Sequence, residues 1–175
     1  MRSNTRLRSL LALLILTIGM IAGTSGALSH AQEHDATPAP GPAVTTEVLG
    51  SGEPDAVTGQ TLWLLRVTFE PGAVAAPHTH PGATVFFIES GEIDLALVEG
   101  TATLTRAGGT PDEPMPSEEL SAGSEVVLSA GDKVFYQEDA VLDEVNNGDE
   151  PVVILLSNIR GTDEPAREPA ATPAA

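Results

Sequence analysis

The sequence predicts an all-β protein, and three observations support that fold class. Short runs rich in Val, Leu, Ile and Thr alternate with Gly, Pro, Asn and Asp clusters, a pattern typical of strands joined by turns. No stretch of this body has a sustained 3.6-residue apolar period with helix caps. Only six of the 175 residues are aromatic, which leaves the core to aliphatic residues that suit sheets. Together these features predict a sandwich or barrel of many short strands.

The first half of the body predicts three strands. Residues 60–69 (QTLWLLRVTF) are β-rich and end at the turn sequence Glu70-Pro71-Gly72. Residues 84–88 (TVFFI) follow. Residues 92–98 (EIDLALV) come next, with apolar side chains at alternate positions, as expected of a half-buried strand.

The second half predicts five more strands around one long loop. The loop is residues 110–119 (TPDEPMPSEE), whose three prolines place it on the surface. Turn residues separate each strand from the next. The expected strands are residues 101–106, 124–129, 132–137, 140–147 and 151–159.

The N-terminus has the three-part pattern of a secretory signal. Three arginines in the first eight residues precede an apolar run at 10–22, and Ser29-His30-Ala31 fits a small-x-small cleavage site. We therefore expect residues 1–31 to be a cleaved signal peptide and the protein to be secreted or extracytoplasmic. The alternative is a retained membrane anchor, for which the run is short, because a spanning helix needs about 20 apolar residues.

Two Pro- and Ala-rich segments flank a single expected domain. Residues 32–42 (QEHDATPAPGP) predict a linker, residues 43–160 the domain, and residues 161–175 (GTDEPAREPAATPAA) a disordered tail. Because neither flank shows an apolar period, we expect the tail to contribute almost nothing to stability.

Charge and cysteine content exclude several classes of protein. All 25 acidic residues lie after Ala31 but only five of the eight basic ones do, so this part has a formal charge near −20. Such a surface repels nucleic acid and anionic lipid, so we expect no nucleic-acid partner and no stable membrane anchor. With no cysteine, disulfides, thiolate catalysis and thiolate metal sites are excluded.

A histidine pair is the clearest chemical feature of the chain. His78 and His80 are one residue apart, so a strand would point both side chains the same way, as a metal site requires. Their surroundings have a regular spacing: Gly72, five residues, His78-x-His80, three residues, Thr84, six residues, Gly91.

A second spaced set lies further along the chain. It runs Gly131, five residues, Gln137-x-Asp139, two residues, Leu142, three residues, Asn146. The two sets resemble the two motifs of the cupin superfamily.

The resemblance covers roughly residues 44–159, and the closing NNGDEPVVIL (146–155) is also similar to small bacterial cupins. It implies a double-stranded β-helix, which is a small jelly-roll barrel, and often a homodimer.

The resemblance also implies a metal-ligand set, from which this chain departs. Metal-binding cupins use the two His and the Glu of the first motif and the His of the second. His78 and His80 are kept, but Thr84 stands at the Glu position and Leu142 at the last His position. Because a bound transition metal normally has at least three protein ligands, we expect a weak or vestigial site. Its metal would be Fe, Mn, Ni or Zn, and Thr84 and Leu142 would line a ligand pocket.

The sequence leaves the register of residues 140–147 open. In the strict motif spacing the inward residues are Leu142, Glu144 and Asn146, and in a register shifted by one they are Asp143, Val145 and Asn147. Burial of Glu144 costs free energy unless the carboxylate is paired, so polarity favours the shifted register, with Asp143 as a third metal ligand. The motif spacing favours the strict register.

Three functions remain open from these residues. The preferred one is an exported, non-catalytic module that binds a small molecule in its barrel. The second is a metal-dependent enzyme, a dioxygenase or isomerase, that uses His78 and His80 with Asp143 or Glu144 as a replacement carboxylate. The third is a structural or adhesive dimer without a ligand. Fold alone does not choose among them.

Overall fold

The structure is a computed structural model that describes residue 41 and residues 43–170. The expected signal peptide, almost all of the expected linker and residues 171–175 lie outside this part of the chain. Among the described residues, no helix is long and apolar enough to cross a membrane.

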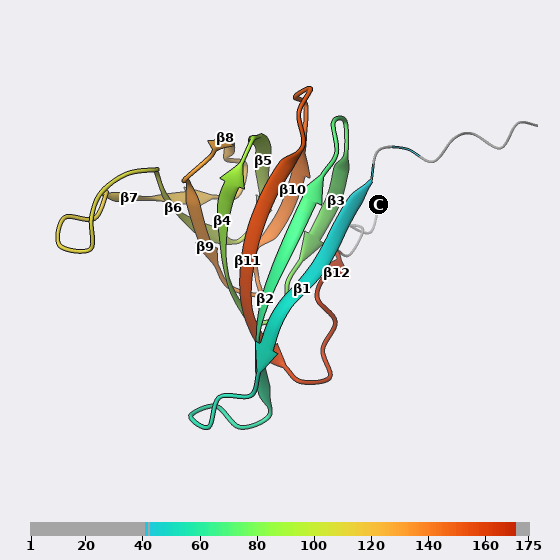
Figure 1. Ribbon diagram of the computed structural model, residues 1–175, viewed down its shortest axis with the longest axis vertical. Helices are drawn as coiled ribbons and strands as arrows, with labels where there is room; N and C mark the ends of the chain where they lie inside the picture. The colour runs from blue at the N-terminus through green and yellow to red at the C-terminus, as the bar shows by residue number, and fades with distance from the viewer. Residues whose placement is uncertain (1–40, 42, 171–175) are drawn as a thin grey trace, which may run out of the picture. The chain divides into compact units, whose positions relative to one another are not determined.

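The described body is built from twelve β-strands in two sheets, and the predicted all-β fold is confirmed (Figure 1). The seven-stranded sheet has the order β1-β2-β11-β4-β9-β6-β7, and the five-stranded sheet has the order β12-β3-β10-β5-β8. All pairings within both sheets are antiparallel. The strands are β1 (Val44–Gly52), β2 (Gln60–Phe69), β3 (Val74–Thr79), β4 (Ala83–Ser90), β5 (Glu92–Glu99), β6 (Thr101–Thr105), β7 (Ser117–Ser121), β8 (Glu125–Ser129), β9 (Lys133–Tyr136), β10 (Val141–Val145), β11 (Val152–Gly161) and β12 (Glu168–Pro169).

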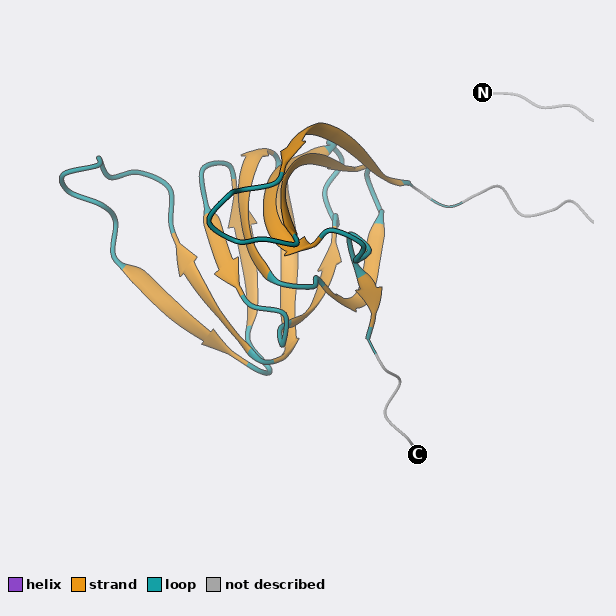
Figure 2. Cartoon of the chain, turned by 90° about the horizontal axis from the view of Figure 1, so that it is seen from below, coloured by secondary structure: helices purple, strands orange, loops and turns teal. Residues whose placement is uncertain are grey.

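The two sheets share one apolar core. Figure 2 shows the strands curving around a common interior. Buried residues from both sheets form a single cluster, with Leu65 and Phe86 from the larger sheet and Leu95 and Leu128 from the smaller. Burial alternates strictly along β11, as expected when one face of a strand meets the core and the other faces outward.

The motif glycines have a backbone reason for their place. Gly72 and Gly91 both have positive φ, 77° and 83°, a region that residues with a Cβ rarely adopt. At Gly91 a Cβ would also lie 2.9 Å from the Pro151 carbonyl oxygen. The sharp turn between β4 and β5 therefore depends on glycine.

Four strands were not expected from the sequence: β12 in the expected tail, and three earlier ones. β1 has few apolar residues and is an edge strand whose side chains are mostly exposed. β3 contains Pro77, a residue that usually argues against a strand. β7 begins inside the expected loop 110–119 and pairs with β6. In each case backbone pairing, and not an apolar pattern, makes the strand.

The expectation of a disordered tail after residue 160 is wrong for residues 161–170. β11 continues to Gly161, and β12 pairs with β3. We call residues 162–170 the C-terminal strap. The Ala170 amide donates to the Pro77 carbonyl at 3.0 Å, and the Thr162 amide donates to the Gly59 carbonyl at 3.1 Å. These are backbone contacts, which a Pro- and Ala-rich composition neither requires nor prevents.

β10 follows the strict motif spacing. Leu142 is paired with His78 on β3. The side chains of Leu142, Glu144 and Asn146 are all buried, with relative exposures of 0%, 5% and 0%. Asp143 and Val145 alternate with them and are only partly buried. The register that polarity favoured is therefore not the one the chain adopts.

Candidate ligand cavity and histidine pair

The two histidines meet inside the body. His78 lies on β3 and His80 directly after it, and both are buried, at 5% and 7% exposure. Their Nε2 atoms are 3.1 Å apart, and the rings meet edge to face at a centroid distance of 4.9 Å. The two histidine side chains therefore lie on the same side, as predicted, and their rings are in direct contact.

The other nitrogen of each ring fixes its tautomer. His78 Nδ1 lies 3.0 Å from the Ala76 carbonyl oxygen, and His80 Nδ1 lies 2.8 Å from the Ala166 carbonyl oxygen. A carbonyl only accepts, so each Nδ1 must carry the proton and donate it. In the neutral rings both Nε2 atoms are then acceptors that face each other without a proton between them.

Burial opposes the extra proton that would satisfy this contact. It lowers the pKa of His80 to about 4, and the neighbouring His78 lowers it further in the same direction. Burial also lowers the pKa of His78, more than the Ala76 hydrogen bond raises it. At neutral pH both rings are neutral, and the facing lone pairs form a local acceptor site.

Glu144 stands beside the pair. Its Oε2 lies 3.6 Å from His78 Nε2 and has no hydrogen-bond partner among the described residues. Burial raises the pKa of Glu144 to about 8; the charge of Arg167 opposes this rise, and Asp143 makes a smaller upward contribution. Because Glu144 is protonated and His78 neutral at pH 7, this contact is not an ion pair, although the distance would allow one. Protonation also lowers the cost of burying the side chain, which explains how the strict register is tolerated.

These residues form one end of a cavity of about 180 Å³. At this polar end lie His78, His80, Glu144 and Arg167 of the C-terminal strap. The rest of the wall is mainly apolar and comes from four strands of the larger sheet, from β3 and from the strap. The apolar lining residues are Val44, Leu65, Val67, Phe69, Ala75, Phe86, Ile154, Leu156 and Ala166 of the strap.

The two residues expected in a pocket wall, Thr84 and Leu142, are both buried. Thr84 is 1% exposed, and its Oγ1 accepts a hydrogen bond from Asn158 Nδ2 at 2.9 Å. Leu142 is fully buried in the core cluster. Neither lines the cavity, so the two family positions that lack a ligand residue here are filled by core packing.

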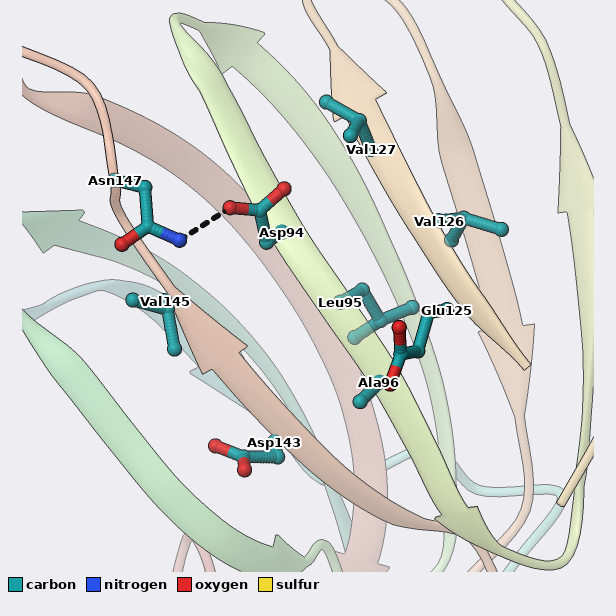
Figure 3. A pocket seen from close by; sticks show the side chains of 9 residues that line it. All are labelled: Asp94, Leu95, Ala96, Glu125, Val126, Val127, Asp143, Val145 and Asn147. Carbon is teal, nitrogen blue, oxygen red and sulfur yellow. Dashed lines mark hydrogen bonds between the residues drawn. The ribbon is translucent and has the colours of Figure 1, made fainter. Parts of the chain in front are cut away.

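Asp143 lies on the opposite face of β10 from Glu144. It lines a separate outer pocket of about 460 Å³ on the five-stranded sheet, together with Asp94 and Glu125 (Figure 3). In the same pocket Asn147 donates a hydrogen bond to Asp94. The structure thus brings Glu144, and not Asp143, to the histidine pair.

The fit to a metal is incomplete. The donor set of two imidazole nitrogens and one carboxyl oxygen has suitable chemistry, and the Nδ1 hydrogen bonds to carbonyl oxygens are typical of metal-binding histidines. However, within residues 43–170 no group of three or more His, Cys, Asp or Glu side chains is arranged to hold a metal ion. Glu144 must also lose its proton before it can act as a ligand.

Arg167 was not anticipated, because the sequence placed it in a tail. Its position depends on the pairing of β12 with β3, a tertiary contact that leaves no local pattern. Glu144 was accessible from the sequence through the strict motif spacing, which proved the better guide than polarity.

One family model matches part of the chain. Residues 65–110 match the family model described as Cupin domain. No curated protein sequence matches.

Solved structures similar to this chain are remote. A cupin 2 domain-containing protein from Halorhodospira halophila is 14% identical over 73% of this chain and 70% of its own, with a TM-score of 0.47. A cupin domain from Bordetella pertussis is 16% identical over 69% and 96%, with a TM-score of 0.37. DMSP lyase DddQ from Ruegeria pomeroyi is 20% identical over 75% and 54%, with a TM-score of 0.43. The chain spans about half the length of the DMSP lyase structures that it matches. At these scores the similarity carries no information about activity.

Proposed function

We propose that this chain, a member of the cupin superfamily, is an exported, non-catalytic module that binds a small, largely apolar molecule in its barrel. The observation that supports the proposal is the cavity, with an apolar wall and one polar end. Ligand sites commonly combine an apolar lining with a few polar groups that orient the ligand.

The cavity volume limits the ligand. About 180 Å³ is below the roughly 300–1,000 Å³ of sites for drug-sized molecules. It is close to the roughly 150 Å³ of an apolar protein cavity that binds benzene. We therefore expect a ligand of about the size of one substituted ring.

Binding is favoured over catalysis by the residues at the family's ligand positions. Thr84 and Leu142 supply no metal ligand and are packed away from the cavity. At neutral pH the polar end holds two neutral imidazoles and a protonated carboxyl group.

The binding proposal is tested with the mature chain and benzyl alcohol as the probe. We expect saturable chemical-shift changes at cavity-lining methyl groups in NMR spectra. Ala75→Leu fills part of the cavity and should abolish them, whereas Val127→Leu, on the exposed face of β8, should not. Equal binding by wild type and Ala75→Leu, with the latter folded by circular dichroism, would place the ligand elsewhere.

One observation favours the alternative of a metal-dependent enzyme. His78 Nε2, His80 Nε2 and the unpartnered Glu144 Oε2 lie close together; they are not arranged to hold a metal ion as they stand, and a divalent Fe, Mn, Ni or Zn would need both ionisation of Glu144 and a shift of these side chains. Such a metal would polarise a bound oxygen group. Metal analysis of the dialysed protein decides: a stoichiometric metal that Glu144→Gln removes and Asp143→Asn retains would favour the enzyme.

Export is part of the proposal and rests on the pattern of residues 1–31. The mature protein should begin near Gln32. N-terminal sequencing from expressing cells checks this, and a product that starts at Met1 and sediments with membranes would contradict it.

A homodimer would use the outer face of the seven-stranded sheet. Leu64, Val85 and Phe135 are each at least 40% exposed. Strand register aligns them in one row through Ser157 of β11, because directly paired residues share a face. Light scattering of wild type and Val85→Glu should show a dimer and a monomer, and a monomeric wild type would contradict the pairing.

A further inference from the structure

Arg167 is held at the cavity by its neighbours on the C-terminal strap. The carbonyl of Ala166 accepts the hydrogen bond from His80 Nδ1 at 2.8 Å. On the other side, Glu168 pairs with Thr79 in the β12–β3 ladder. Ala166 is therefore bonded to His80, and Glu168 is paired with β3. These two contacts hold Arg167 between them at the cavity wall.

Arg167 differs from the other arginines of the described chain in its contacts. Arg66 pairs with two glutamates, and Arg106 pairs with Asp132 at 2.9 Å. Arg160 donates to a side-chain oxygen and a backbone carbonyl. For Arg167 there is no ion pair or hydrogen bond of the side chain with any residue from 43 to 170. A guanidinium without a partner among residues 43–170 is notable, because the chain has 25 acidic residues.

The cavity offers Arg167 no internal counter-ion at contact distance. Glu144 is the one carboxyl group in the lining, and it lies against His78 at 3.6 Å without an ion pair to Arg167. A guanidinium presents a planar set of donors that matches a carboxylate in a two-point contact. The arrangement is an apolar chamber with a free anion-binding group at its edge.

We propose that Arg167 is the specificity-determining residue of the cavity and that the ligand is a small apolar carboxylate. This inference rests on the proposed binding function and names its ligand class. The apolar body of the ligand fills the chamber, and its carboxylate meets the guanidinium at the strap. The large negative charge of the chain repels anions over most of its surface, so a carboxylate binds only where an exposed cation offsets this repulsion.

Matched pairs of probes test the charge requirement. Benzoate and benzamide have the same shape and differ in charge, and isobutyrate and isobutyramide form a smaller pair. By isothermal titration calorimetry, we expect wild type to bind each carboxylate at least ten-fold more tightly than its amide. Arg167→Gln should remove this preference and leave amide affinity unchanged, and Arg167→Lys should keep part of it. Added salt should weaken carboxylate binding alone.

Control variants separate this inference from the proposed function. Arg66→Gln removes an arginine that is already paired on the outer face and should not alter the preference. Glu144→Gln should keep the preference for carboxylates, because Glu144 is already uncharged at pH 7 and makes no ion pair with Arg167. Equal binding of acid and amide, or a preference for the acid that survives in folded Arg167→Gln, would overturn the role of Arg167. The proposed binding function of the cavity would still stand. Binding of no probe, benzyl alcohol included, would defeat both.

Discussion

The two faces of β10 hold similar side chains in opposite environments. Glu144 faces the interior beside the histidine pair, is buried, and has its pKa raised to about 8. The adjacent Asp143 faces the outer pocket with Asp94 and Glu125 (Figure 3). Likewise, Asn146 is fully buried, whereas Asn147 is exposed. One residue of register therefore decides whether an acid or an amide becomes part of the cavity and core or part of the solvated surface.

The difference shows that spacing outweighs polarity in setting the register here. An inward Glu144 is costly as an ion, but it is tolerated because it keeps its proton and lies in a cavity wall. An inward Asn146 satisfies backbone groups of the adjoining turn, which the shifted register would leave without this partner.

The largest expected effect is the loss of stability on replacing Asn146, the inner of the two adjacent asparagines. Asn146 donates to the Phe69 and Glu150 carbonyls at 3.0 and 2.9 Å and accepts from the Gly148 amide at 3.0 Å. Asn146→Ala leaves these groups unpaired, and we expect a loss of about 2–4 kcal/mol in the free energy of unfolding. Urea denaturation measures it.

The outer amide is the control for that change. Asn147 donates one hydrogen bond to Asp94 at the surface. Asn147→Ala should cost less than about 1 kcal/mol, as most exposed substitutions do. If both variants lost the same stability, the inner and outer faces would not differ as the structure implies.

The next effect depends on pH. The folded state holds the Glu144 proton up to about pH 8, against an ordinary value of 4.5, so this residue makes stability fall as pH rises between these values. The neutral histidines act in the opposite direction below their ordinary value of 6.5. Stability should therefore fall mainly between about pH 6.5 and 8, by about 2 kcal/mol for roughly 1.5 pKa units.

The inner and outer acids again serve as a matched pair. Glu144→Gln cannot ionise and should flatten the decline, whereas Asp143→Asn should retain it. Thermal melts of the three proteins at half-unit pH intervals make the comparison. A decline of the same size in Glu144→Gln would assign it to another group.

A smaller loss of stability is expected from removing the C-terminal strap, which carries Arg167 at the cavity. A chain ending at Gly161 loses β12, the His80 hydrogen bond to Ala166 and the Arg160 bond to the Glu164 carbonyl. We expect a loss of about 1–3 kcal/mol, because a few net hydrogen bonds of about 1 kcal/mol each disappear. A chain ending at Ala170 should match the full chain. An unchanged melting temperature after the longer deletion would mean that the strap does not dock in solution.

The smallest effect concerns weak metal binding at the inner face. Wild type should bind Ni(II) weakly, and Glu144→Gln should lower the affinity by a few-fold, because one of three donors is lost. Asp143→Asn, with its change on the outer face, should bind as wild type does. Equilibrium dialysis at pH 8 gives the affinities. A larger loss of Ni(II) affinity in Asp143→Asn than in Glu144→Gln would indicate that Asp143 is the ligand, as in the shifted register.

The sequence predicted the strands that carry an apolar pattern and missed those that do not. β2, β4 and β5 follow from their β-branched or alternating residues, and the motif spacing placed His78 and His80 on one face. β1 depends on backbone pairing with the next strand, and β3 and β12 depend on pairing with strands far along the chain; such pairing leaves no apolar pattern in the strand itself. For the same reason no pattern in the sequence indicated that Ala166 and Arg167 would reach the histidine pair.

The place of β11 in the larger sheet has a consequence for how the chain folds. β11 lies between β2 and β4 and pairs with both (Figure 1), yet it is synthesised well after both of them. Until Val152–Gly161 has emerged, β2 and β4 each lack a neighbour, and their open edges can pair with other chains. The sheet therefore closes late through contacts between residues far apart in sequence, which slows folding and prolongs the period when aggregation competes with it.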